Sequence, residues 1–392
     1  MELLIGFFFI ILVVSSLVAT RRIESPYVLV SGIWGLFLIM FSIFGHNFMP
    51  LGYRFYISIV LWVSMFYLGS LFGIQFTNKS HCSNVPDSYI TKSYYIITPI
   101  FAIISSYLSI RQAWGSSNPF LYLRMMSTGL DESIQGPDKG VFVYLTSLIL
   151  ILFLIELATN GLKRKKIVIV LFFLNILLAF ISMAKSIIFT TMVSAIIVLL
   201  LRKEISFKLL ALSLFLIFGL FIGMQTIRSQ ESEVGISFFE SYFYANAVAF
   251  EHVEFSNDSP FGAYVFRLIY AIGHRFGLTA APVDTIMQYT AVGHNRVTNT
   301  YTVLYPFFHD FGYLGVAIFG LFLGLITGYF YKKSRYSIPA KVMYSILGAT
   351  ILFQLFGEIL MTNASLYIQY LFYAYLPYKV KIAHGRNFDG HL

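Results

Sequence analysis

Long apolar runs recur along the whole chain and are separated by short polar segments. A helix of roughly 20 predominantly apolar residues is long enough to cross a bilayer. The pattern therefore predicts an all-α polytopic membrane protein of about eleven transmembrane helices, within a range of about 10–12. The predicted spans are 3–20, 27–45, 55–76, 93–110, 141–160, 167–184, 186–201, 208–224, 303–331, 340–360 and 365–378.

Two polar segments between these runs are long. If the spans alternate in direction, residues 111–140 and 225–302 lie on the same side of the membrane. The second segment has about 78 residues, and a structureless connection of that length is uncommon. Helical patterns near 236–255 and 282–292 predict short helices on the mouth of the bundle. No internal repeat or soluble domain interrupts the pattern, so residues 1–392 are predicted to form a single membrane domain.

Composition and charge support this interpretation. Hydrophobic residues make up 58% of the chain and charged residues only 11%, against roughly 25% in soluble domains. Alternation places 18 of the 27 Lys and Arg residues in the shorter loops of one side and nine on the other. Because cytoplasmic loops are enriched in Lys and Arg, the net charge of +9 predicts membrane orientation and not nucleic-acid binding.

The first apolar run has the features of a retained helix. Glu2 precedes it and Arg21 and Arg22 follow it, the reverse of the charge order in a signal peptide. We therefore expect the N-terminus and both long loops on the periplasmic side of a bacterial inner membrane, and the C-terminus in the cytoplasm. The single cysteine, Cys82, excludes an intramolecular disulfide.

The large loop carries four arginines and no lysine: Arg228, Arg267, Arg275 and Arg296. Guanidinium groups bind phosphate oxygens in pairs and stay charged, which suits a pyrophosphate head group. Arg228 follows the span 208–224 closely, at the depth of lipid phosphates. Lys185, at the turn after 167–184, is a further candidate for a cavity wall, as is Glu358. The alternative is that the arginines pair with acids of the same loop, or that these groups are interface anchors.

Histidines also concentrate here. The loop and the span after it contain His252, His274, His294 and His309, half of the eight in the chain. A histidine is a suitable general base near neutral pH, although each alone is more often a structural hydrogen-bonding group. The spacing lacks H-x-x-x-H, so no metal or other cofactor is expected.

The segment Asn299–Gly315 leads from this loop into the span 303–331. Asp310 falls about two turns into an otherwise apolar helix, just after Pro306, where an ionisable group usually faces a cavity or a partner. It is either a catalytic group or a structural acceptor for a neighbouring helix or loop amide. Because adjacent helical residues diverge by about 100°, His309 and Asp310 are expected to have different partners. Small faces for helix packing are predicted at Gly312, Gly315, Gly320 and Gly324.

These motifs resemble those of the oligosaccharide repeat-unit polymerases, the Wzy family that makes O-antigen and related bacterial surface polysaccharides. The resemblance rests on the pattern N-T-Y-T…P-x-x-x-D-F-G-x-x-G over Asn299–Gly315 and on the aromatic stretch Tyr242–Glu251 ahead of Phe261-Gly262. It also rests on the hydropathy profile, with one dominant outside loop between two late helices. The motif match covers roughly residues 225–331.

The resemblance implies a metal-independent, C-type glycosyltransferase fold without a cofactor. The growing glycan would move from undecaprenyl pyrophosphate to a lipid-linked repeat unit. The other partners would be membrane lipids and a chain-length regulator protein. Pyrophosphate would be bound by Arg228, Arg267, Arg275, Arg296 and Lys185. Asp310 and His309 would act near the acceptor, with Glu240 and His252 as further candidates for the base. Asn299, Tyr301 and Tyr244 would contact other parts of the substrate.

Three other functions compete with this interpretation. A lipid-linked oligosaccharide flippase would need charged residues lining a central cavity across several helices, often in two similar halves. An O-antigen ligase is chemically close to a polymerase. A metal-dependent C-type glycosyltransferase would need an acidic pair in its first outside loop, but 45–54 has no acid and Asp131-Glu132 lies one outside loop later.

Overall fold

The computed structural model describes residues 1–77, 86, 88–128, 142–228, 241–255, 260–284, 287–294 and 296–379, apart from some side chains within these ranges. Its long helices match the eleven predicted spans one for one. They are α1 (Glu2–Thr20), α2 (Pro26–Phe44), α3 (Tyr53–Gln75), α4 (Ser88–Ala113), α6 (Phe142–Asn160), α7 (Lys165–Ile181), α8 (Lys185–Arg202), α9 (Phe207–Arg228), α13 (Leu304–Lys333), α14 (Ile338–Phe353) and α15 (Ala364–Lys379).

Six of these helices are long and apolar enough to cross a membrane: α1, α2, α3, α4, α8 and α13. The apolar parts of α6 and α14 are shorter than 18 residues. The part of the chain that the structure describes is thus an all-α membrane protein, with a single small β-hairpin.

The structure contradicts two of the predicted helical ranges, one in the large loop and one among the long spans. The described residues of 282–292 are not helical: β1 (Thr290–Gly293) pairs antiparallel with β2 (Arg296–Thr298). The predicted span 340–360 is also too long, because α14 ends at Phe353 and residues 354–363 are not helical. The remaining short elements are η1 (Gly45–Asn47), α5 (Pro119–Thr128), the π-helical turn η2 (Ser241–Ala245), α11 (Asn246–His252) and α12 (Arg267–Arg275).

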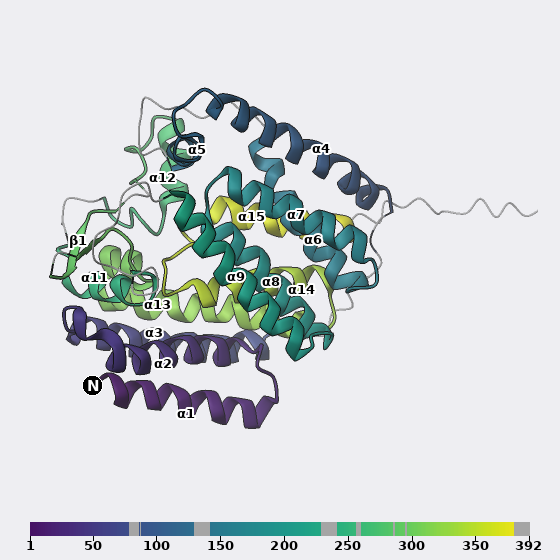
Figure 1. The fold of residues 1–392 in the computed structure, drawn as a ribbon. Coiled ribbons are helices and arrows are strands. Elements are labelled where there is room, and N and C mark those ends of the chain that lie inside the picture. The colour runs from purple at the N-terminus through teal and green to yellow at the C-terminus, as the bar shows by residue number, and fades with distance from the viewer. Residues whose placement is uncertain are drawn as a thin grey trace, which may run out of the picture.

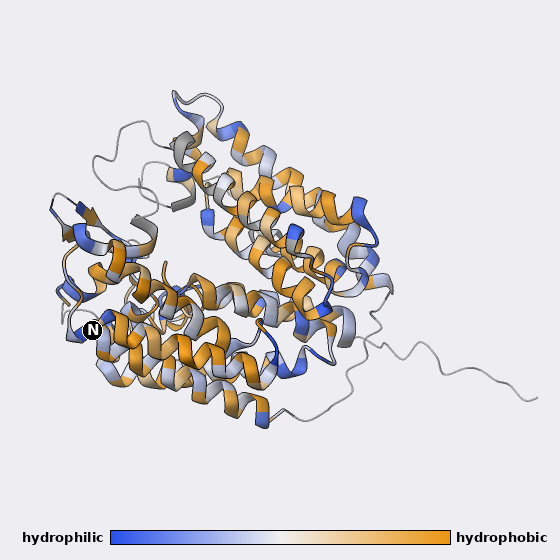
Figure 2. Cartoon of the chain, turned by 60° about the horizontal axis from the view of Figure 1, so that its bottom comes forward, coloured by the Kyte–Doolittle hydropathy of each residue, from blue (hydrophilic) through white to orange (hydrophobic). Residues whose placement is uncertain are grey.

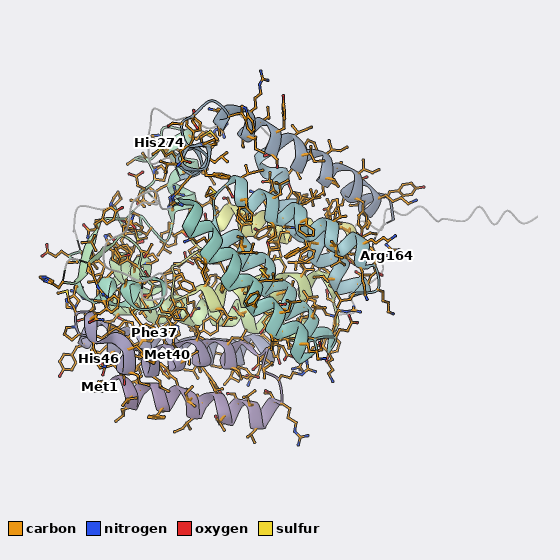
Figure 3. The ribbon with its side chains drawn as sticks, in the orientation of Figure 1. Met1, Phe37, Met40, His46, Arg164 and His274 are labelled. Atoms are coloured by element: carbon orange, nitrogen blue, oxygen red, sulfur yellow. The ribbon has the colours of Figure 1, made fainter. Side chains whose placement is uncertain are left out.

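The long helices alternate in direction, so the bundle has two distinct ends (Figure 1). We call the loop end the one where α2, α4, α7 and α9 finish and where α11, α12 and the hairpin lie. The opposite, basic end carries Arg164, whereas Met1, His46 and His274 lie at the loop end (Figure 3). Hydrophilic residues gather toward the ends and the middle of the helices is apolar (Figure 2). This is the distribution that a bilayer imposes.

The buried side chains form separate clusters. One joins α1, α2, α3, α11 and α13, and two more join α4, α6–α9, α14 and α15. Gln354 connects the first cluster to the segment after α14. Its Oε1 accepts hydrogen bonds from the indole Nε1 atoms of Trp34 and Trp62, both at 3.1 Å. Its carbonyl accepts from the amide of Val303 at 2.8 Å.

Glycines allow α13 to pack directly on the backbone of α3. A Cβ at Gly324 or Gly328 would lie 2.2 Å from the carbonyl oxygen of Phe66 or Ser70. Gly69 is equally close to the carbonyl of Leu321, so the contact is reciprocal. Small residues of this kind are what close helix pairs in membranes use. The predicted packing role is confirmed for Gly324 and for Gly320, which faces Trp62.

Gly312 has a different role from the one expected. Its φ of 61° and ψ of −149° interrupt the helical geometry of α13, in a region that favours glycine. Pro306, which was expected to loosen the backbone, lies in the first turn of α13, where a missing amide hydrogen costs nothing. The kink therefore comes after Asp310 and not before it.

Candidate functional site

A cavity of about 480 Å³ opens among α4, α5, α6, α7, α8 and α15, near the loop end of these helices. Its wall combines leucine, isoleucine and methionine with many uncharged polar groups. The polar lining residues are Ser105, Ser109, Thr146, Ser147, Asn175, Ser182, Ser186, Thr190, Asn363, Tyr367 and Tyr370. The volume is within the range of small-molecule sites in proteins.

Helical spacing explains why these groups converge. Ser105 and Ser109 are four residues apart on α4, and Ser186 and Thr190 are four apart on α8. Residues with this spacing lie one above the other on a helix face. A polar face on an otherwise apolar helix is costly in lipid, so several such faces turn inward toward one another.

The hydroxyl groups of the wall differ in how far the fold already uses them. The Oγ of Ser147 donates to Oε1 of Gln369 at 3.0 Å, and the Oγ of Ser182 donates to the carbonyl of Leu178 at 2.8 Å. By contrast, no hydrogen bond to a described residue engages the hydroxyl of four lining residues. These are Ser105, Ser109, Ser186 and Thr190. Their hydroxyls are available to a ligand that carries its own donors and acceptors.

No charged side chain lines the cavity among the described residues. Of the residues that we predicted for a site, Lys185 and Glu358 directly precede lining residues of the cavity, Ser186 and Ile359. Only 7% of Lys185 is exposed. A buried ammonium so close to a polar wall is rare in a membrane protein and usually has a function.

A second cluster, which we call the cap, consists of α11, α12, the β1–β2 hairpin and the first turns of α13. Within it, Nδ1 of His309 lies 3.0 Å from Oδ1 of Asp310, and their side chains are 6% and 1% exposed. The expectation that these neighbours have separate partners is therefore wrong. Both residues keep helical backbone geometry, so the contact comes from the orientation of the two side chains.

Asp310 also anchors the loop that precedes α12. Its Oδ2 accepts from the backbone amides of Tyr264 and Val265 at 3.0 and 2.8 Å. This is the structural alternative that the sequence left open, a bond to loop amides. The imidazole of His309 packs against Tyr264, Tyr305 and Phe255, with centroid distances of 4.7–5.7 Å. Its Nε2 forms no hydrogen bond with a described residue.

The three described arginine side chains of the large loop have separate surroundings. The Nε of Arg267 donates to the carbonyl of Val283 at 2.9 Å, and the guanidinium of Arg296 lies over Phe48, 5.1 Å from the ring centroid. Arg275 is exposed at the end of α12. Neither Arg267 nor Arg275 forms an ion pair with a described residue. Arg228 ends α9, with its side chain outside the described atoms.

Three of the other predicted site residues, His252, Tyr301 and Tyr244, are bonded to or packed against other parts of the fold. Nε2 of His252 lies 2.9 Å from the carbonyl of Pro50. The hydroxyl of Tyr301 donates to the carbonyl of Gln288 at 2.8 Å, and burial raises its pKa. Tyr244 is 1% exposed among Phe37, Phe41 and Phe48. Asn299 is half-buried after β2, whereas Glu240 lies outside the described residues.

One arginine that the sequence analysis did not single out holds the cap in place. The guanidinium of Arg54 donates to the carbonyls of Glu251 and Val253, both at 2.8 Å, and satisfies the C-terminal end of α11. It also lies over the ring of Phe255, at 5.1 Å. Carbonyl groups at a helix C-terminus attract cations, and this explains the arrangement.

The segment 354–363 joins the cap to the cavity. The carbonyl of Leu355 accepts from Nδ2 of Asn246 on α11 at 2.9 Å, while Ile359 and Asn363 line the cavity. Between them, the buried carboxylate of Glu358 accepts from the amides of residues 360–362, at 2.8–2.9 Å. Glu358, predicted as a possible cavity wall, instead fixes the turn that leads into α15.

Sequence reasoning missed the cavity itself. A signal was present, because serine, threonine, asparagine and tyrosine recur at helical spacing in α4, α8 and α15. Because single hydroxyls are common in membrane helices, no one helix indicates a site. The site is indicated only when the polar residues of six elements are seen to converge.

The chain was also compared with family models, with curated proteins and with solved structures, and no match was found.

Proposed function

We propose that this protein is a polysaccharide repeat-unit polymerase that joins undecaprenyl-pyrophosphate-linked oligosaccharides at the outer face of a bacterial inner membrane. The observation that carries the proposal is the cavity of about 480 Å³, lined by hydroxyl, amide and phenol groups and opening near the loop end. Sugars present hydroxyl groups that both donate and accept hydrogen bonds. The cavity wall offers the matching chemistry, and apolar side chains beside it suit the less polar faces of sugar rings.

The orientation in the membrane is part of the same proposal. Arg164, Arg202 and Lys333 lie at helix ends of the basic end. By the positive-inside rule this end faces the cytoplasm, which puts the cavity and the cap outside. Lipid-linked glycans that have already been moved across the membrane would reach the site from that side. We propose that all eleven long helices cross the membrane and that they form a C-type glycosyltransferase fold.

The proposed reaction needs no change in oxidation state. An acceptor hydroxyl oxygen bonds to the anomeric carbon of the donor glycan, and the bond from that carbon to the diphosphate oxygen breaks. Undecaprenyl diphosphate leaves with the bonding electrons. The acceptor proton passes to a base, for which His309 is the predicted group because the Asp310 carboxylate at its Nδ1 would stabilise the imidazolium.

The leaving diphosphate needs a cation. Lys185 is the first candidate, because it starts α8 directly beside the lining residue Ser186. A buried ammonium in a region of low dielectric stabilises developing negative charge more strongly than one in water. Arg228, Arg267, Arg275 and Arg296 remain predictions for this role.

Filling the cavity tests the proposal. In the organism that encodes the protein, the chromosomal gene is replaced by the Ser109→Phe variant, and the surface glycan is separated by length. Phenylalanine would occupy the space of the ligand, so we expect glycan with a single repeat unit in place of long polymer. Ile110→Phe is the matched control, because Ile110 is the next residue of α4 and is 38% exposed on the outside of the bundle.

The competing functions give different patterns. Loss of a flippase or a ligase would leave no repeat unit on the surface, and either result for a gene deletion would contradict the proposal. Full-length polymer from Ser109→Phe at a normal protein level would remove the cavity from the reaction.

A further inference from the structure

The segment 260–283, which contains α12, has an apolar face that no other described helix covers. Ile269, Ile272 and Phe276 recur at helical spacing and are 62%, 52% and 73% exposed. Leu278 and Phe261, at the two ends of the segment, are exposed by 79% and 76%. Contiguous exposed apolar side chains of this size mark an interaction surface.

The opposite face of α12 is the one that the rest of the segment holds. The hydroxyl of Tyr270 donates to the carbonyl of Phe261 at 2.9 Å, and Nε of Arg267 donates to the carbonyl of Val283. Nδ1 of His274 lies 3.3 Å from the carbonyl of Thr279. Because these polar residues turn toward the rest of the segment, the apolar face of α12 turns away from it.

The base of the segment is fixed, so its orientation is not arbitrary. Phe261 and Phe266 pack on Phe311 with centroid distances of 5.0 and 5.9 Å, and Phe266 also contacts Phe319 further along α13. Asp310 holds the amides of Tyr264 and Val265 in the same turn. α12 is thus attached to α13 at the loop end of the bundle, the end at which Figure 1 draws it.

The charge of the segment identifies the occupant of the apolar face. Residues 260–283 contain Arg267 and Arg275 and no Asp or Glu. Arg275 is exposed and forms no ion pair with a described residue. An amphipathic helix with bulky apolar side chains on one face and arginine at its edge is suited to lie in the plane of a membrane interface.

We infer that α12 lies on the leaflet at the loop end, with Ile269, Ile272 and Phe276 among the acyl chains and Arg275 on the phosphates of anionic phospholipids. This partner is the membrane surface itself, so the inference holds whether or not the protein polymerises glycans. It also gives Arg275 a phosphate partner other than the one predicted from the sequence.

Spin-label depth measurements on the full-length protein test the inference. In a Cys82→Ser background, which removes the single cysteine, Ile272→Cys is labelled with a nitroxide. The protein is reconstituted in vesicles of phosphatidylcholine with phosphatidylglycerol. Collision rates are measured with oxygen, which concentrates in the acyl region, and with a water-soluble nickel chelate.

Tyr289→Cys is the matched control, since Tyr289 is 70% exposed just before β1 and outside the segment. We expect the ratio of oxygen to nickel collisions to be higher at position 272 than at 289, and to rise with the phosphatidylglycerol content. Equal ratios at the two positions would overturn the inference. So would dipolar broadening between labels at 272, because it would place a second copy of the chain on this face.

Discussion

In the cap, polar side chains are bonded to backbone atoms of the protein itself, whereas in the cavity several polar side chains are not. Asp310 holds two loop amides, Arg54 holds the end of α11, and His252 contacts the carbonyl of Pro50. The hydroxyls of Ser186 and Thr190 face the cavity without a described partner. Both regions lie at the same end of the bundle.

This difference separates polar groups that build the fold from polar groups that are available to a ligand. A buried donor or acceptor costs free energy unless it is paired, so irregular backbone near a membrane needs side chains to satisfy it. The cap contains much irregular backbone, and Asp310 and Arg54 satisfy parts of it. The cavity is built mainly from regular helices whose backbone is already satisfied, which leaves several of its side chains to a substrate.

The largest effect is expected at Asp310. Asp310→Ala leaves the amides of Tyr264 and Val265 without their acceptor, which should lower the free energy of unfolding by about 2–4 kcal/mol. Unfolding by detergent titration of the purified protein measures the change. The loop before α12 should also become more sensitive to protease.

Asp310→Asn separates the structural role from a catalytic one. The amide oxygen still accepts a hydrogen bond, so stability should change less than with alanine. Polymer formation should nevertheless fall, because a neutral amide at Nδ1 would not stabilise the His309 imidazolium. Full-length polymer from a stable Asp310→Asn protein would limit Asp310 to its structural role at the amides of Tyr264 and Val265.

The helical part of the fold was readily predicted from the sequence. In lipid, an isolated apolar segment can hydrogen-bond all of its backbone groups only as a helix. The runs 55–76 and 208–224 accordingly match α3 and α9 within a few residues. The run 340–360 was overextended because apolar composition does not reveal where Gln354 leaves the helix to meet Trp34 and Trp62.

The site was predicted less well, and the reason is physical. Charged and aromatic residues in a loop stand out by composition, but Arg296, Tyr301 and Tyr244 turn out to make packing contacts and hydrogen bonds within the fold. The cavity depends on which helices are neighbours, and single hydroxyls on α4 and α8 carry no information about that. Lys185 was singled out because a charge at a helix start is conspicuous even when its neighbours are unknown, and its role stays a prediction.

A smaller effect is expected at Gln354, which begins the connection between cap and cavity. Gln354→Leu removes the acceptor of two buried indole donors and should cost about 1–3 kcal/mol of unfolding free energy. Detergent titration again measures it, and tryptophan fluorescence should change because Trp34 and Trp62 are both 0% exposed.

The double variant Gln354→Leu with Trp62→Phe is the control for this contact. Removing a donor together with its acceptor should cost less than the sum of the two single changes. Strict additivity would mean that the contact does not stabilise the protein, and that 354–363 is held by other bonds such as Asn246 to Leu355.

The smallest effect on stability, and the sharpest test of the comparison, is expected from two serines of the cavity wall. Ser186 has a hydroxyl that no described residue engages, while the Oγ of Ser182 already donates to the carbonyl of Leu178. Ser186→Ala should change the free energy of unfolding by less than about 0.5 kcal/mol. Its polymerisation rate should nevertheless fall roughly 2–10-fold, because one neutral hydrogen bond to a ligand contributes about 0.5–1.5 kcal/mol. Ser182→Ala should leave the rate nearly unchanged, since its hydroxyl is committed to the helix. If the two variants lost the same activity, an unengaged hydroxyl would not distinguish a ligand contact from a structural one.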